Sequence, residues 1–197
     1  MQRALRLHRE IKDGVVFMQQ FLKHPHQVAS IIPSSRFLER RIIEMAEIRS
    51  ARTVVELGAG TGGTTRAILG ALPPGATLLS IEINPQFCAL LGRIPDARLV
   101  VHRGGAEDLQ DALLQYGLPA PDVVISGIPF STMDRIAGAR ILKAISSALA
   151  LGGRFLAYQV SARVADLSRP LLGPGRVELE LLNVPPMRLY RWEKQTA

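Results

Sequence analysis

The chain has 197 residues, of which 47% are hydrophobic and 21% are charged, and its formal net charge is +7. This composition fits one compact domain with a substantial core and excludes a chain that is disordered throughout. The single cysteine, Cys88, excludes an internal disulfide and a metal site built from several cysteines, so we expect no bound metal.

The first segment is basic and amphipathic. Residues 1–52 contain ten Lys or Arg and five Asp or Glu, whereas the rest contains fourteen and twelve. Over residues 3–23, apolar side chains recur at steps of three and four, which predicts a helix with one apolar stripe. It either packs on the domain's own core or lies in a membrane interface, where its cations would meet lipid phosphates. Those cations are Arg3, Arg6, Arg9, Lys12 and Lys23.

Neither a membrane span nor a signal peptide is evident. No apolar run reaches the roughly 20 residues that cross a bilayer, and charges between Arg9 and Asp13 interrupt the N-terminal segment. We therefore expect a cytoplasmic protein. His24-Pro25-His26 ends the first helix, and Pro33-Ser34-Ser35 predicts the cap of a second helix over about 36–49. Residues 1–52 form a helical extension to a core of residues 53–197, within one structural domain.

The remainder alternates between strands and helices. Short apolar runs predict buried parallel strands, and two alternating segments joined by Val184-Pro185-Pro186 predict a closing antiparallel pair. The pattern resembles the Rossmann-like α/β fold of class I methyltransferases, a seven-stranded, mostly parallel sheet with an antiparallel last strand and helices on both faces. The ligand is then expected beyond the carboxyl ends of the strands. The strands are expected at 53–57, 77–82, 98–102, 122–126, 153–160, 176–183 and 187–192, with helices at 63–71, 85–92, 107–116 and 134–150.

A glycine-rich loop follows the first strand. Its spacing also satisfies the G-x-G-x-x-G pattern of dinucleotide-binding proteins. Glu56, before the first glycine, suits the ammonium group of an amino-acid moiety, and Glu82, at the end of the next strand, suits the two hydroxyls of a ribose. Together they favour S-adenosylmethionine, with S-adenosylhomocysteine as product, over a nicotinamide. The cofactor residues predicted here are Glu56, Gly58, Ala59, Gly60, Thr61, Gly62, Thr64, Glu82, Ile83 and Asn84.

Two later loops complete the predicted site. After the third strand, Glu107 or Asp108 could contact the adenine, with Gly105 and backbone N–H groups at Ala106 and Glu107; alternatively, both acids only begin the next helix. After the fourth strand, Ser126 and Gly127 could hold an amine and Phe130 could pack on it when it is cationic. Ser126 is also counted among the cofactor residues. The predicted catalytic loop comprises Ser126, Gly127, Ile128, Pro129 and Phe130.

Taken together, these segments resemble the bacterial phospholipid N-methyltransferases of the PmtA type. The resemblance rests on Ile32-Pro33-Ser34-Ser35, the Val55–Gly62 loop, Ser80–Asn84, Ser126–Phe130 and Asn183-Val184-Pro185-Pro186. It implies methylation of phosphatidylethanolamine and of its mono- and dimethyl forms towards phosphatidylcholine. It also implies peripheral binding of the basic helix to the anionic inner leaflet of the cytoplasmic membrane. No nucleic acid and no obligate protein partner are expected.

The chain departs from this family where Gln159-Val160-Ser161-Ala162 replaces the usual Gln-Phe-Thr-Tyr, so Tyr190 is the remaining aromatic candidate for the head group. Arg188, Arg176 or the N-terminal cations could hold the lipid phosphate. The expected reaction is direct attack of a neutral amine on the methyl group, with His24, His26 or solvent taking the amine's proton. The alternatives are a ribosomal RNA adenine N-methyltransferase, whose loop is similar, and a nicotinamide-binding or regulatory domain.

Overall fold

The computed structural model describes residues 34–183 and 185–195. The predicted helix over 3–23, His24, His26, Pro33 and Val184 therefore lie outside the described residues. Within the described ranges, none of the helices is long and apolar enough to cross a membrane.

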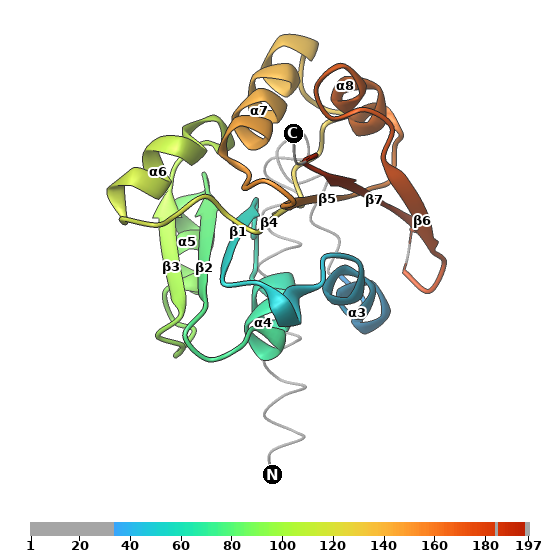
Figure 1. Ribbon diagram of the computed structural model, residues 1–197. Coiled ribbons are helices and arrows are strands. Elements are labelled where there is room, and N and C mark those ends of the chain that lie inside the picture. Colours follow the sequence, from blue (N-terminus) through green and yellow to red (C-terminus); the bar gives the residue numbers. More distant parts are fainter. Residues whose placement is uncertain (1–33, 184, 196–197) are drawn as a thin grey trace.

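A seven-stranded sheet in the order β3-β2-β1-β4-β5-β7-β6 forms the centre of the molecule (Figure 1). β7 runs antiparallel to both of its neighbours, and every other pair is parallel. The strand order reverses between β1 and β4, which is where a doubly wound sheet binds its ligand. The strands are Thr53–Leu57 (β1), Thr77–Glu82 (β2), Leu99–Arg103 (β3), Val123–Ser126 (β4), Arg154–Gln159 (β5), Arg176–Glu180 (β6) and Met187–Glu193 (β7).

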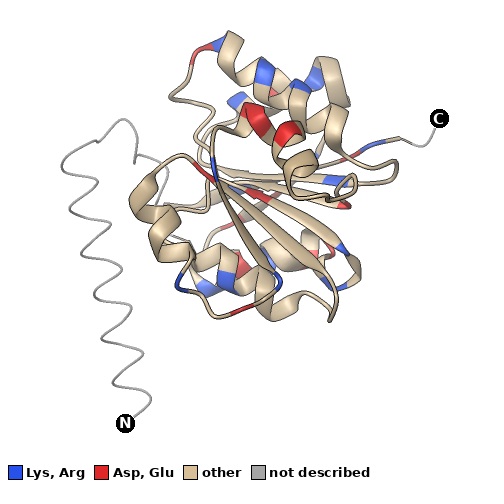
Figure 2. Cartoon of the chain, turned by 90° about the vertical axis from the view of Figure 1, so that its left-hand side faces the viewer, with Lys and Arg blue, Asp and Glu red and all other residues tan. Residues whose placement is uncertain are grey.

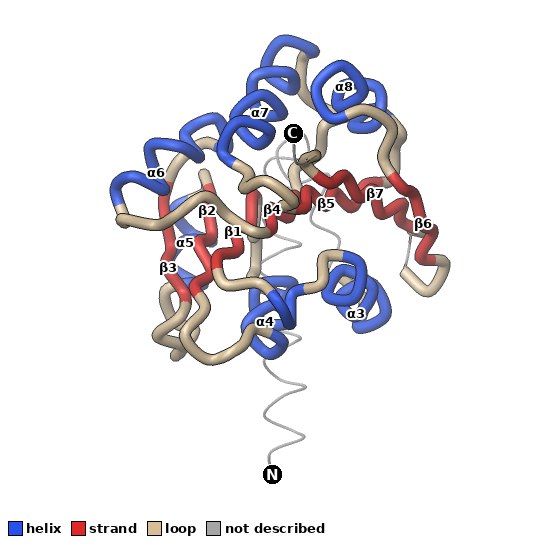
Figure 3. Tube along the Cα trace, in the orientation of Figure 1, coloured by secondary structure: helices blue, strands red, loops and turns tan. Residues whose placement is uncertain are grey.

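Helices cover both faces of the sheet, and Figure 3 shows the strands as one row between the two helical layers. One core lies under α6, α7 and α8, and a second lies under α3 and α4. The predicted class of fold is therefore confirmed. The helices are Arg36–Met45 (α3), Gly63–Ala71 (α4), Pro85–Leu91 (α5), Leu109–Gln115 (α6), Arg135–Ala148 (α7) and Arg163–Leu172 (α8), with 3-10 turns at Ile48–Ser50 (η1) and Ala106–Asp108 (η2).

α3 is capped as the sequence predicts but is shorter. The Ser35 hydroxyl accepts a hydrogen bond from the Leu38 N–H, 3.2 Å away, at the helix start. The helix ends at Met45, and Glu47 adopts a left-handed conformation with φ of 52°. This turn leads the chain into β1 and brings the Glu47 carboxylate to Arg154 and Arg191, so a straight helix to residue 49 is wrong.

α8 is an element that the sequence pattern did not predict. It contains Pro170 within its last turn, and Ala162 at its start has no capping side chain. Val164 and Leu167 nevertheless bury its inner side against the sheet. Packing therefore stabilises a helix whose local signals are weak.

Candidate active site

The glycine loop forms a tight turn from β1 into α4. Gly58 and Gly62 have φ values of 76° and 83°, a region that other residues adopt only with strain. A Cβ atom on Gly58 would also lie 3.1 Å from Cγ1 of Ile128. The loops after β1 and β4 are thus close together, and a larger residue at position 58 would strain the backbone and require Ile128 to move.

Glu82 lies at the end of β2, facing the glycine loop. Its two carboxylate oxygens accept hydrogen bonds from the Gly60 and Asn84 N–H groups, each at 2.9 Å. Each oxygen keeps a second lone pair, so the carboxylate can also accept hydroxyl groups. The next residue, Ile83, is 73% exposed and offers an apolar surface beside those acceptors. The pair suits a ribose with an adjoining flat ring.

Glu56 is the most unusual group in the site, because its carboxyl is fully buried within β1. Oε2 accepts hydrogen bonds from the hydroxyls of Thr65, at 2.6 Å, and Ser80, at 3.1 Å. Oε1 is buried and has no partner among the described residues. Burial raises the pKa of Glu56 to about 7, although the two hydrogen bonds oppose this. An ammonium group would supply the missing partner and the compensating charge.

The loop after β3 lies beside Glu82, because the Gly104 N–H donates to the Glu82 carbonyl over 3.2 Å. Oδ2 of Asp108 accepts the Gly105 N–H at 3.0 Å, so part of this carboxylate caps the following turn. Glu107 and Asp108 are both exposed. The structure therefore brings the predicted adenine loop next to the predicted ribose carboxylate.

The loop after β4 is held from both sides. The Gly127 N–H donates to the Leu57 carbonyl over 3.0 Å, and Nε2 of Gln159 donates to the Ile128 carbonyl over 2.7 Å. Within the loop, the Ile128 N–H donates to the Ser126 hydroxyl. β1 and β5 thus fix the segment that was predicted to hold the acceptor amine.

Tyr158 is a site residue that the sequence reasoning missed. A Cβ atom on Gly127 would lie 2.4 Å from its hydroxyl oxygen. That oxygen is 3.5 Å from the Thr64 hydroxyl, which is in turn 3.4 Å from the Ser34 hydroxyl. Burial, and then the charge of Glu56, raises the pKa of Tyr158, so the phenol stays neutral. The sequence signal for it is weak: a tyrosine at the penultimate position of a buried strand, just before a loop.

Two distant segments close the site on the side of β5. The Ser35 N–H donates to Oδ1 of Asn183 over 2.9 Å, although 148 residues separate them in sequence. Nδ2 of Asn183 donates to the Pro185 carbonyl, again over 2.9 Å. Ser34, Ser35 and Asn183 therefore lie at the same edge of the sheet as the loop after β4.

Three predicted contacts do not fit the structure. The Phe130 ring is fully buried in the core beside Gly138 of α7, so it cannot pack on an amine. Tyr190 is 6% exposed and stacks on Trp192 in the core under α8, on the opposite face from Tyr158. Arg176 lies at the amino end of β6 and pairs with Glu178, away from the loops. Tyr190 points inward by the alternation of β7, whereas Phe130 lies in the loop after β4, which turns its ring towards α7.

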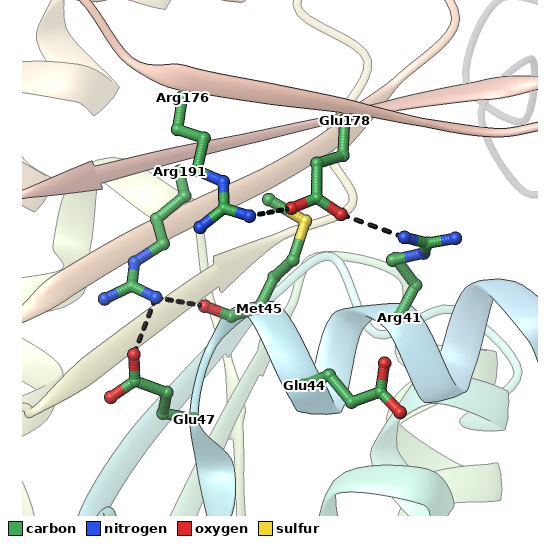
Figure 4. Close-up of a pocket in the computed structure, with 7 residues that line it drawn as sticks. All are labelled: Arg41, Glu44, Met45, Glu47, Arg176, Glu178 and Arg191. Carbon is green, nitrogen blue, oxygen red and sulfur yellow. Dashed lines mark hydrogen bonds and ion pairs between the residues drawn. The ribbon is translucent and has the colours of Figure 1, made fainter.

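A surface pocket lies between the C-terminal half of α3 and the start of β6, away from the glycine loop (Figure 4). Its lining consists mainly of ion pairs. Arg41 pairs with Glu178 at 3.0 Å and with Glu180 at 3.4 Å, and Arg191 pairs with Glu47 at 2.7 Å. We interpret these ion pairs as structural contacts that attach α3 and the turn after it to the β6–β7 hairpin, because the charges are paired with one another.

The chain is 33% identical over 147 residues to the ornithine lipid N-methyltransferase of Singulisphaera acidiphila, which covers 74% of this chain and 77% of that protein. The chain belongs to the family of this lipid N-methyltransferase. The cofactor of this methyltransferase is S-adenosylmethionine, as the sequence predicted. No family model matches the chain.

Solved structures share the fold of the methyltransferase. The O-methyltransferase TomG from Streptomyces achromogenes, in complex with S-adenosylmethionine, has a TM-score of 0.64 at 16% identity, covering 83% of this chain and 82% of that one. The N-methyltransferase NodS from Bradyrhizobium japonicum, in complex with S-adenosylhomocysteine, has a TM-score of 0.65 at 11% identity, covering 83% and 90%.

A second group of relatives matches only part of the methyltransferase. The ribosomal RNA small subunit methyltransferase A of Caulobacter vibrioides is 36% identical over 95 residues, which is 47% of this chain and 34% of that protein. The chain therefore spans about a third of the length of these RNA-modifying relatives.

Proposed function

We propose that the protein methylates the amine of a membrane lipid head group at the membrane surface. Phosphatidylethanolamine, with its mono- and dimethyl forms, is the acceptor favoured by the sequence motifs, and the product would be phosphatidylcholine. The observation that carries the proposal is the similarity to a lipid N-methyltransferase over about three quarters of the chain. That relative's name makes an ornithine lipid the second acceptor to test.

The described residues provide a fitting site for the cofactor. Glu56 would bind the ammonium group, since its Oε1 is buried without a partner. Glu82 would accept the ribose hydroxyls, and Ile83 would pack on the adenine. The turn through Gly58 and Gly62 would let the backbone approach the ligand closely. When bound, the cofactor supplies a methyl group on a sulfonium, an electrophile that needs no covalent enzyme intermediate.

The loop after β4 would hold the acceptor amine with its lone pair directed at the methyl group. Its rigid attachment to β1 and β5 favours alignment, which is the main contribution that a protein makes to such a transfer. The lipid ammonium must lose a proton before it can attack. The hydroxyls of Tyr158, Thr64 and Ser34 form a row from the buried site to a half-buried position, and this row would pass that proton from the amine to solvent.

Lipid phosphate and membrane contacts would come from cations at the same edge. Arg188 is exposed, and its guanidinium donates to the Val160 carbonyl just beyond β5. The predicted N-terminal cations lie outside the described residues, so their membrane role remains an expectation from sequence. The protein would then act from the cytoplasmic side as a peripheral membrane protein.

Methylation of RNA is the competing function, because several partial relatives modify ribosomal RNA. The basic pI of about 10.3 is compatible with it. In the view of Figure 2, however, Lys and Arg of the described residues are spread over both helical layers rather than gathered in one stripe.

The deciding experiment measures transfer of labelled methyl from S-adenosylmethionine to several acceptors in parallel. These are liposomes of phosphatidylethanolamine, with and without anionic lipid, liposomes that contain ornithine lipid, and ribosomal RNA. We expect label in lipid, increased by anionic lipid. Label in RNA alone would replace the proposal with the competing function. Removal of residues 1–24 should reduce binding to anionic vesicles and leave the affinity for S-adenosylhomocysteine unchanged.

A further inference from the structure

An exposed aliphatic surface lies on the β6–β7 hairpin and next to the end of β5. Val160, Val177, Leu179, Leu181 and Leu182 are each between 50% and 68% exposed. Single exposed apolar side chains are common, but a contiguous group of them marks an interaction site. We call these five residues, together with Arg188, the hairpin patch.

The hairpin patch is contiguous because of the sheet register. Leu179 pairs with Arg188 across β6 and β7, and Val177 pairs with Tyr190, so these side chains share one face. The guanidinium of Arg188 donates to the Val160 carbonyl over 2.6 Å, which joins the end of β5 to the same surface. α8 covers Tyr190 and Trp192 but leaves Val177 and Leu179 exposed.

Leu181 and Leu182 directly follow β6, where side-chain hydrogen bonds hold the backbone. The Leu182 N–H donates to Oε1 of Glu180 over 2.8 Å, and Nδ2 of Asn183 donates to the Pro185 carbonyl. Glu180 is itself fixed by Arg41 of α3. Side chains thus bond two backbone groups of this turn, while the side chains of Leu181 and Leu182 remain exposed.

The hairpin patch borders the mouth of the candidate active site. β6 runs parallel to β1, so its carboxyl end lies at the edge of the sheet where the glycine loop turns. Asn183, next to the two leucines, accepts the Ser35 N–H at that edge. Val160 follows Gln159, which holds the loop after β4. Figure 1 shows this hairpin extending beyond α3 at the β6 end of the sheet.

The charges around the hairpin patch favour an anionic partner. Arg188 lies within it and Arg36 follows Ser35, and both are exposed. The carboxylates of Glu178 and Glu180 belong to the opposite face of β6, where Arg41 and Arg176 pair with them. Burial raises the pKa of Tyr190, and one acid, Asp166 of α8, lies close enough to this face for its charge to raise that pKa further. Aliphatic side chains beside arginines match lipid tails beside phosphates, whereas RNA bases stack on aromatic rings.

We propose that the hairpin patch inserts into the lipid surface beside the active site, so that the leucines enter the acyl region and Arg188 meets lipid phosphates. This rests on the proposed function, since it assumes a lipid acceptor. It adds a docking surface separate from the predicted N-terminal helix, and it places the membrane at the edge of the sheet that holds the amine-binding loop.

The test uses the full chain with Leu181→Asp and Leu182→Asp together. The matched control carries Leu114→Asp and Leu151→Asp, which are similarly exposed but precede β4 and β5 at the opposite edge of the sheet. Sedimentation with vesicles of phosphatidylethanolamine and phosphatidylglycerol measures the partition coefficient. We expect it to fall by roughly tenfold or more for the hairpin variant, because two leucines leave an apolar environment. The control should stay within about twofold of the unmodified chain.

Affinity for S-adenosylhomocysteine and the melting temperature should be unchanged in both variants. Unchanged partitioning of the hairpin variant would overturn the inference, even if lipid is methylated. If the hairpin variant also melts at a lower temperature, the leucines pack against other residues of this chain. If light scattering shows that the unmodified chain is a dimer and that the hairpin variant is not, the leucines pack against a second copy of the chain. Failure of the unmodified chain to methylate any lipid would reject the proposed function, while vesicle partitioning still tests the hairpin patch.

Discussion

At the scale of single residues, Glu56 combines burial with an unfilled acceptor. A carboxyl in this position keeps its proton at pH values where an exposed one has lost it, because its charge has few partners. Cofactor binding supplies a positive charge, so it should release that proton. The binding equilibrium and the stability of the unliganded protein are both therefore linked to pH.

We predict that affinity for S-adenosylhomocysteine rises with pH up to about 7, the pKa of Glu56, and then levels off. Below that value each unit of pH should weaken binding by about tenfold, because ionisation must accompany binding. Titration calorimetry between pH 5.5 and 8 measures this. Glu56→Gln should bind weakly and without the pH step; a step that survives in this variant would assign it to another group.

The stability of the unliganded protein changes with pH in the opposite direction to the affinity for S-adenosylhomocysteine. The folded-state pKa of Glu56 is raised from 4.5 to about 7, so the unfolded state loses the proton first as pH rises. The unliganded protein should therefore lose stability between about pH 4.5 and 7, by about 1.4 kcal/mol for each pH unit within that interval. Thermal melts of the Gln variant provide the control, because this contribution should be absent from them.

Tyr158 and Tyr190 provide a matched pair for the acceptor side of the site. Both are buried tyrosines, but only Tyr158 approaches Gly127 and Thr64. We predict that Tyr158→Phe lowers kcat by roughly ten- to a hundredfold, as expected for one lost polar contact near the reacting groups, with affinity for S-adenosylhomocysteine nearly unchanged. Tyr190→Phe should leave kcat as it is. Equal effects in the two variants would indicate a packing role for both side chains.

At the scale of elements, the ion pairs between α3 and the hairpin decide whether the acceptor side is assembled. Arg41 pairs with Glu178 and with the nearly buried Glu180. We predict that Arg41→Leu costs about 1–3 kcal/mol of stability, since it leaves the nearly buried carboxylate of Glu180 without its cationic partner. It should raise the KM for lipid more than the KM for the cofactor.

The neighbouring Arg40 is the control for this prediction. It is 75% exposed, and among the described residues its ion pair is with Glu44 on the same helix. Arg40→Leu should therefore change stability by no more than about 0.5 kcal/mol. Chemical denaturation measures both variants, and similar losses from the two would remove the special role of the Arg41 pairs.

Much of the fold could be read from the sequence, because buried parallel strands and their turns leave strong patterns. The glycine loop, Glu82 and the Ser35 cap were predicted at the correct positions. α8 was missed because it begins without a capping side chain and contains Pro170. Tyr158 was missed because the strand Phe-Leu-Ala-Tyr-Gln is buried on both faces, so no alternation distinguishes the side that meets the site. Phe130 and Tyr190 were misplaced because the sequence motifs do not show whether an aromatic side chain points to the site or into the core.

At the scale of the whole molecule, the candidate active site has two halves with different origins. The cofactor half uses β1, α4 and β2, which follow one another in the chain. The acceptor half needs Tyr158 from β5, Asn183 from the turn after β6, and Ser34 and Ser35 from the segment before β1. The hairpin patch borders the acceptor half, so the proposed membrane contact lies beside the groups that would hold the lipid amine.

The Ser35–Asn183 hydrogen bond has a consequence for how assays of this protein are read. Closing a loop of 148 residues costs about 5 kcal/mol in chain entropy, whereas one hydrogen bond returns about 1 kcal/mol. The bond therefore cannot hold the two ends together; it forms because the sheet between them is complete. Binding of S-adenosylhomocysteine reports on the first strands and the loops after them, whereas methyl transfer also depends on the late strands of the sheet. A variant that binds the product but transfers nothing has thus lost either a reacting group or the global assembly, and only a stability measurement distinguishes these two causes.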